Sequence, residues 1–216
     1  MAIYDLEEQE QISELKAWWE QYGKYVTGLA VIAAVASVAW QGLNWYQNKQ
    51  ASEAGALYSA VQAAVGKREP ARTREAAGQL IEKFPGSIYA DMAAMVSANL
   101  QFAEGDARNA RAHLEWVVAN GNDPILRDLA RLRLATVMFD EGAGPDALKQ
   151  LEPAPVEGLR FRFEDLRGDI LALDGKPAEA RKAYQAALDL LAAQGAVAGG
   201  EPLVEVIRVK LESLEG

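Results

Sequence analysis

Few residues in this chain of 216 residues could take part in catalysis. It contains one histidine, His113, and no cysteine. A cysteine–histidine pair and a thiolate or histidine-rich metal site are therefore excluded. His113 stands beside Leu114 within a helical pattern. We expect it to be a surface or packing residue rather than a base.

Two other patterns look like parts of catalytic motifs. Asp165 and Asp169 are one helical turn apart, but acidic pairs on helices are mostly solvated. The run Gly142-Ala143-Gly144-Pro145 is too short for a phosphate-binding loop and lacks the Lys and Ser/Thr that follow such glycines. The sequence predicts that the protein is not an enzyme and has no cofactor.

The net charge of the chain limits the classes of molecule that it can bind. The net charge is −9, so the chain has no long-range attraction for nucleic acid, which is not an expected ligand. The lack of cysteine excludes disulfides and is compatible with an oxidising compartment without demonstrating one. The acidic charge gives no attraction for anionic lipid either, which is likewise not an expected ligand.

An uncharged stretch organises the chain. Between Lys24 and Lys49 there is no Asp, Glu, Lys, Arg or His. As a helix these residues would extend about 36 Å, which exceeds the roughly 30 Å hydrocarbon core of a bilayer. Aromatic rings stand at both ends, as interfacial side chains do: Tyr25, Trp40, Trp45 and Tyr46. The sequence predicts a single transmembrane helix over residues 25–46.

Two alternatives to a retained anchor are a buried core helix and a cleaved signal peptide. Ala34-Val35-Ala36 has the small-x-small form of a cleavage site. A signal peptide, however, begins with a short basic region, whereas residues 1–24 hold six acidic residues against two lysines. Lys16 and Lys24 before the span, against Lys49 after it, favour a cytoplasmic N-terminus by a margin of one residue.

One face of the predicted span carries small and polar residues at helical spacing. They are Ala30, Ala34, Ser37 and Gln41. Small residues let another helix approach closely, and a glutamine in lipid requires a hydrogen-bond partner. This face is expected to pack against a second membrane helix. The alternative is that alanine is simply common in such helices.

After the span the helical pattern continues, and no two-residue alternation predicts a strand. Helices are predicted over residues 53–65, 70–84, 88–104, 107–119, 124–141, a short segment from 145, 160–173, 177–194 and 202–214. A loop is predicted from Gly195 to Gly200. The fold class is therefore all-α.

The turns between these helices repeat. Gly105, Gly142 and Gly175 each end a helix, 37 and 33 residues apart. Five residues after each glycine stands an alanine, and nine residues after it a large side chain: Ala110 and Leu114, Ala147 and Leu151, Ala180 and Tyr184. A helix–turn–helix unit of about 34 residues is the period of tetratricopeptide repeats. The last unit fits best, although Glu164 stands where a tryptophan is usual.

Aligning the units by their glycines gives three to four repeats, of which the first, from about Ala54 to Pro85, is degenerate. An ordinary helical bundle with chance spacing is the alternative. The first helix of each unit lines the concave side of such a stack, and positions 5 and 12 of the repeat point into it. These residues are Tyr58, Met95, Phe102, Leu132 and Phe139. They predict a protein-binding groove for apolar segments, unless they are core residues or are covered by the C-terminal helix.

With the anchor and the repeats in place, the chain resembles the YfgM family of Gram-negative bacteria. The resemblance rests on several stretches: Met1 to Glu8, Trp18-Trp19 before Gly23-Lys24, Gln41 to Tyr46, Phe84 to Ala90, Leu166 to Asp169, and Gly175-Lys176-Pro177. These motifs are structural and carry no catalytic residue.

The resemblance implies an ancillary subunit of the Sec translocon in the inner membrane. Residues 1–24 would be cytoplasmic, and residues 47–216 would form a periplasmic domain resembling tetratricopeptide repeats. The implied partners are the SecYEG translocon, the prolyl isomerase PpiD and exported polypeptides, which would be passed to periplasmic chaperones. Alternatives are a tethered scaffold for another envelope complex, or a regulator of a stress-response factor through residues 1–24.

Overall fold

The computed structural model describes residues 4–194 and 202–215, and these residues contain helices and no strand. The predicted loop from Gly195 to Gly200 lies outside them. The α-helices are α1 (Tyr4–Gly66), α2 (Pro70–Lys83), α3 (Ile88–Ala103), α4 (Ala107–Asn120), α5 (Pro124–Asp140), α6 (Gly144–Leu151), α7 (Arg160–Leu173), α8 (Pro177–Ala193) and α9 (Pro202–Glu212). Short 3₁₀ turns, η1 (Glu157–Leu159) and η2 (Ser213–Glu215), precede α7 and follow α9.

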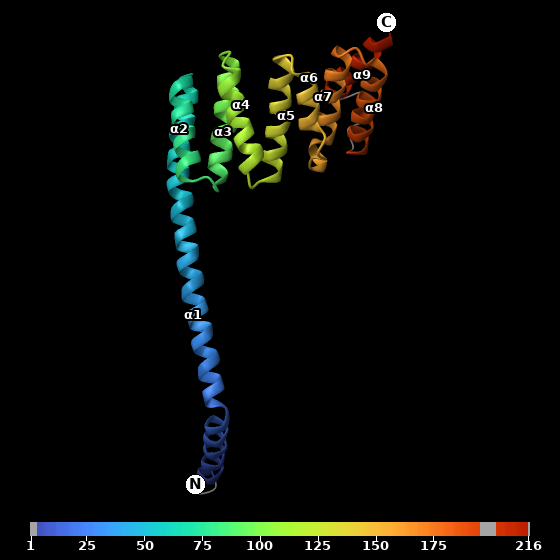
Figure 1. Ribbon diagram of the computed structural model, residues 1–216. Helices are drawn as coiled ribbons and strands as arrows, with labels where there is room; N and C mark the ends of the chain where they lie inside the picture. Colours follow the sequence, from blue (N-terminus) through green and yellow to red (C-terminus); the bar gives the residue numbers. More distant parts are fainter. Residues whose placement is uncertain (1–3, 195–201, 216) are drawn as a thin grey trace. The chain divides into compact units, whose positions relative to one another are not determined.

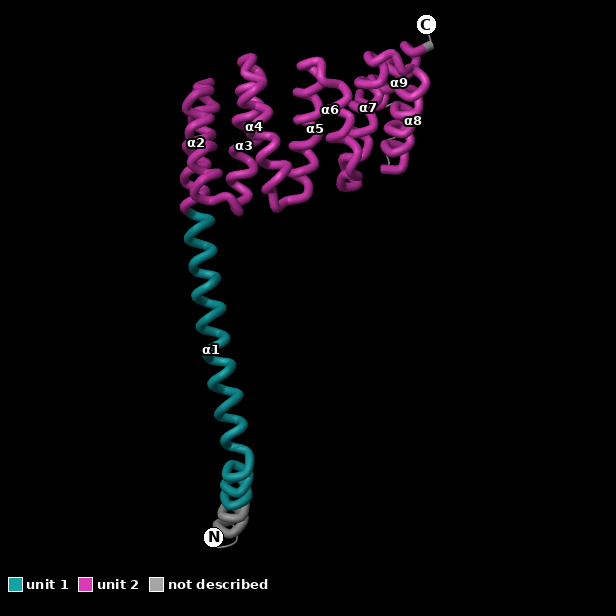
Figure 2. The backbone as a smooth tube through the Cα atoms, in the orientation of Figure 1, with its two compact units in different colours: residues 1–52 teal, residues 53–216 magenta. Residues whose placement is uncertain are grey.

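The chain divides into two compact units, Met1–Ser52 and Glu53–Gly216 (Figure 2). In the first unit, residues 25–46 belong to α1, and their side chains are exposed, as lipid-facing side chains would be. This is the one described stretch that is long and apolar enough to cross a membrane. The all-α class with a single N-terminal transmembrane helix is confirmed.

One helix replaces two predicted segments. The sequence predicted a span over residues 25–46 and a separate helix over 53–65, whereas α1 runs from Tyr4 to Gly66. The first proline of the chain is Pro70. A single glycine inside a helix costs only about 1 kcal/mol relative to alanine, so the glycines of this stretch do not end it.

In the second unit, helices α2 to α8 stand side by side in chain order (Figure 1). The three turn glycines have the predicted left-handed conformation, with φ of +83° at Gly105, +81° at Gly142 and +73° at Gly175. Each alanine five residues later is fully buried, and each large residue nine later is at most 3% exposed. The predicted repeat is confirmed, because the glycine reverses the chain and the alanine brings the paired helices together.

The degenerate first unit uses Arg68 at the position of the turn glycine. Arg68 has a φ of +53° and is the only non-glycine residue with positive φ among those described. Its N–H donates to the Val65 carbonyl and the Glu69 N–H to the Ala64 carbonyl. The same two bonds close the turn at Gly142. Five residues after Arg68, Thr73 is fully buried in the place of the repeat alanine.

Replacing Arg68 with glycine is expected to stabilise the protein. A left-handed conformation costs a non-glycine residue about 1 kcal/mol or more, and glycine adopts it without that penalty. Thermal unfolding of the full chain in detergent should show a gain of about 1 kcal/mol, reduced by the greater unfolded-state entropy of glycine. The control Lys67→Gly, one residue earlier, should destabilise. A loss at Arg68→Gly would show that the arginine side chain stabilises this turn.

The apolar core of the second unit forms three clusters. The first joins the end of α1 to α2 and α3, and includes Tyr58 and Leu80. The largest extends from α3 to α7. The third joins α7, α8 and α9, where Ile207 is fully buried. Helix α9 therefore covers the end of the repeat stack, which would otherwise expose apolar side chains to water.

Candidate binding surfaces

The predicted groove residues differ in how far their side chains are buried. Tyr58 and Met95 are 8% and 4% exposed, and they belong to different core clusters. Phe102, Leu132 and Phe139 are half-buried and pack against the largest cluster. The structure therefore brings Met95, Phe102, Leu132 and Phe139 together along α3 and α5, with Met95 beneath the surface. Tyr58 instead lies beside Tyr89, with ring centroids 5.6 Å apart.

Sequence reasoning missed a segment that we name the strap, residues 152–156, between α6 and η1. Side chains of two neighbouring helices hold its backbone. From α5, Arg131 donates to the Pro153 carbonyl over 3.1 Å, and Asp128 accepts from the Val156 N–H over 2.6 Å. From α7, Arg167 donates to the Leu151 carbonyl just before the strap over 2.8 Å. The strap is thus bound through its peptide groups.

Asp128 and Arg131 also form an ion pair one turn apart on α5. Their side chains are only 8% and 10% exposed, and the Arg131 guanidinium lies 5.4 Å from the centre of the Phe163 ring. Two charges removed from water need each other and further hydrogen bonds to offset their desolvation. Here those further bonds are made to the strap, so the ion pair and the strap depend on each other.

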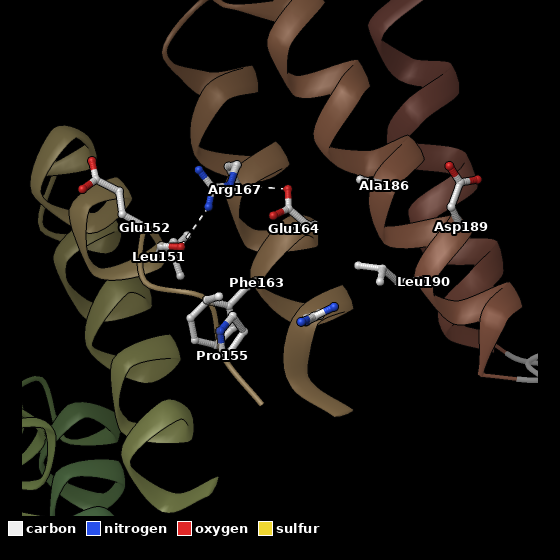
Figure 3. A pocket seen from close by; sticks show the side chains of 11 residues that line it. Leu151, Glu152, Pro155, Phe163, Glu164, Arg167, Ala186, Asp189 and Leu190 are labelled. Atoms are coloured by element: carbon white, nitrogen blue, oxygen red, sulfur yellow. Dashed lines mark hydrogen bonds and ion pairs between the residues drawn. The ribbon is translucent and has the colours of Figure 1, made fainter. Parts of the chain in front are cut away.

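A cleft of about 490 Å³ lies between the strap, α7 and α8. Figure 3 shows Arg167 between Leu151 and Glu164, with Ala186, Asp189 and Leu190 of α8 on the opposite side. Glu164 stands at the repeat position where a tryptophan is usual, and it lies 3.4 Å from Arg167. A short charged side chain in place of a large ring leaves this space open. A second cleft, of about 580 Å³, lies between the strap and α5.

Asp165 and Asp169 were expected to be solvated, and this is wrong. Lys210 of α9 donates to both carboxylates over 2.8 Å, and the Tyr184 hydroxyl donates to Asp169 over 2.8 Å. Burial raises the pKa of Asp165, and the Lys210 ammonium opposes that rise. The pair therefore fastens the C-terminal helix to α7. The lysine lies 45 and 41 residues away in sequence, so the local pattern could not indicate it.

His113 is half-buried on α4, and burial together with nearby Arg74 lowers its pKa. It is therefore neutral at physiological pH. The described residues contain no cluster of acidic or histidine side chains that could hold a metal ion.

The predicted packing face of the span is exposed along α1. Ala30, Ala34, Ser37 and Gln41 all have solvent-accessible side chains. The Gln41 side chain donates to the Ser37 hydroxyl over 3.4 Å, which is long for a hydrogen bond. The remaining polar atoms of this amide are available to a neighbouring helix.

Known proteins are similar to this chain over nearly its whole length. Residues 16–216 match the family model described as a tetratricopeptide repeat-like domain. The ancillary SecYEG translocon subunit of Neisseria gonorrhoeae is 30% identical over 97% of this chain and 98% of its own length. The chain belongs to the YfgM family. Two other family members are similar over most of their lengths: the subunits of Escherichia coli (28% identical, 86% of this chain and 89% of theirs) and Haemophilus influenzae (26%, 85% and 90%).

Membership of the YfgM family accounts for the whole architecture. The family alignment extends across both the apolar helix and the repeats, because the Neisseria relative matches this chain almost end to end. A repeat-like domain is typical of proteins that act by binding other proteins.

Proposed function

We propose that the protein is a membrane-anchored adaptor of the Sec translocon. The observation that carries this proposal is the end-to-end similarity to ancillary SecYEG translocon subunits. The anchor, α1, would hold the repeats beside the channel in the inner membrane. The repeats would bind exported polypeptides and a periplasmic partner such as the prolyl isomerase PpiD, and would help pass the polypeptides to chaperones.

In this proposal residues 1–24 lie in the cytoplasm and residues 47–216 in the periplasm. Lysines at positions 16 and 24, against one at position 49, support this orientation. Protease treatment of spheroplasts tests it, since added protease should degrade the repeats while leaving residues 1–24 intact. Affinity purification of the solubilised full chain should recover the translocon. Recovery of another envelope complex without the translocon would instead favour a tethered scaffold.

We expect the face formed by Ala30, Ala34, Ser37 and Gln41 to contact a second membrane helix. Because the chain has no cysteine, Ala34→Cys provides a unique site for a thiol-linked photocrosslinker. Ala39→Cys is the matched control, because five residues place it about 140° around the helix. Crosslinking to a membrane protein should be several-fold stronger from position 34. Equal yields from both positions would contradict a specific face.

The surface along α3 and α5 that carries the predicted groove residues is the proposed site for exported chains. Phe102 and Phe139 are its half-buried rings, and replacing both with serine removes apolar surface from it. Photocrosslinking of an arrested export intermediate to the variant should fall, while recovery of the translocon should persist. Unchanged crosslinking with an intact helical spectrum would place the client site elsewhere.

A further inference from the structure

Helices α3 and α5 present equivalent faces that remain partly accessible. Residues offset by 37 occupy matching places on the two helices: Met92 and Leu129, Met95 and Leu132, Asn99 and Thr136, Phe102 and Phe139. Apart from the buried Met95, they are half-buried or exposed. We call this surface the α3–α5 face. It is mostly apolar, so it provides contact area but little discrimination between partners.

Arg133 is the exception at the edge of this face. The equivalent residues of the neighbouring units are Val96 on α3 and Leu166 on α7, which are apolar and pack against core clusters. The repeat unit formed by α5 and α6, which we call the middle unit, therefore has a guanidinium where the units before and after it have an aliphatic side chain. Arg133 follows Leu132 directly and precedes Thr136 by one turn, so it lies on the same half-buried arc of α5.

The Arg133 side chain has no partner among residues 11–194 and 202–214, whose side chains the structure describes. It forms no hydrogen bond or ion pair with them, although the residue is half-buried. Burial lowers its pKa, and no nearby carboxylate opposes that effect. The last unit differs, because Asp165 and Asp169, which match Leu132 and Thr136 of α5, are neutralised by Lys210. Arg133 has no such counter-charge among the side chains that the structure describes.

We propose that Arg133 determines specificity on the α3–α5 face by pairing with an aspartate or glutamate of the bound polypeptide. The partner is a segment whose apolar side chains cover Phe102, Leu132 and Phe139 and which carries a carboxylate beside them. The inference rests on the proposed adaptor function and names the chemistry of the segment that is bound. Arginine suits this role because its planar guanidinium binds a carboxylate through two parallel hydrogen bonds.

The test uses the full chain in lipid nanodiscs and two fluorescent peptides with blocked termini. Both consist of Leu, Phe and Ser, and they differ only in a central Glu or Gln. A partly desolvated ion pair should make the Glu peptide bind about tenfold more tightly in fluorescence anisotropy. Arg133→Met, which keeps an apolar stem of similar length, should remove this preference. Arg133→Lys should retain part of it, and Arg108→Gln on α4, an equal change of charge elsewhere, should leave it unchanged.

Three outcomes would overturn the inference: equal binding of the two peptides, a preference that survives Arg133→Met, or no binding of either peptide. A variant that only unfolds at lower temperature while the peptide preference stays would show that Arg133 packs through its stem. None of these results affects recovery of the translocon by the full chain, so the inference can fail while the proposed function stands.

Discussion

Replacing Arg131 with methionine is expected to destabilise the protein by about 3–5 kcal/mol. The substitution leaves the carboxylate of Asp128 buried without its counter-charge, and it removes the hydrogen bond to the Pro153 carbonyl. The strap thereby loses one of its two hydrogen bonds to α5 and keeps the one from the Val156 N–H to Asp128. The unfolding midpoint of the detergent-solubilised chain in urea should fall accordingly, and proteolysis should increase within residues 152–156.

The pair of Lys149 and Asp146 is a matched control. It has the same i, i+3 spacing and a 2.8 Å contact, but its side chains are 66% and 58% exposed. Lys149→Met should cost less than about 1 kcal/mol, because water screens this pair. Adding Asp128→Asn to Arg131→Met should recover part of the loss, since a neutral amide can still accept from the Val156 N–H. A double variant no more stable than Arg131→Met would refute the role of the unpaired charge.

The repeat could be predicted because its determinants are local in sequence. A glycine that ends a helix, an alanine five residues later and a large side chain after nine recur at a fixed period, and each has a steric reason. The positive φ of Arg68 was not predicted, because the usual local signal for that conformation is glycine or asparagine. The alignment of Pro70 with Pro177, each opening a second helix, is the signal that could have located it.

The strap could not be predicted because its attachments join distant parts of the chain. Pro153 and Pro155 indicate that α6 ends, but not that Arg131, 22 residues earlier, binds the segment that follows. The degree to which each side chain is buried could not be predicted from the sequence either. Met95 and Phe102 share a helix face, yet Met95 is 4% exposed while Phe102 is half-buried. Sequence periodicity determines the direction of a side chain, and packing determines its exposure.

A second large loss of stability is expected from a substitution at Gly168, where α7 crosses α8. A Cβ atom at this position would overlap the Tyr184 ring, with Cζ at 2.9 Å and other ring atoms closer still. The ring cannot move aside easily, because its hydroxyl donates to Asp169 and Lys210 lies 5.8 Å from its centre. Gly168→Ala should therefore destabilise by about 1–3 kcal/mol, measured as a lower unfolding midpoint with faster hydrogen exchange in α7 to α9.

Gly78 on α2 is the matched control, because a Cβ atom there meets nothing within 4 Å. Gly78→Ala should stabilise by about 0.5–1 kcal/mol, as alanine does in a helix interior. The same substitution should thus change the free energy of unfolding in opposite directions at two helical glycines. This difference separates the effect of close packing from that of helix propensity. In a double-mutant cycle, Tyr184→Leu should make Gly168→Ala less harmful, since the overlapping ring is gone. An additive cycle would mean that strain within α7, rather than contact with α8, requires glycine at this crossing.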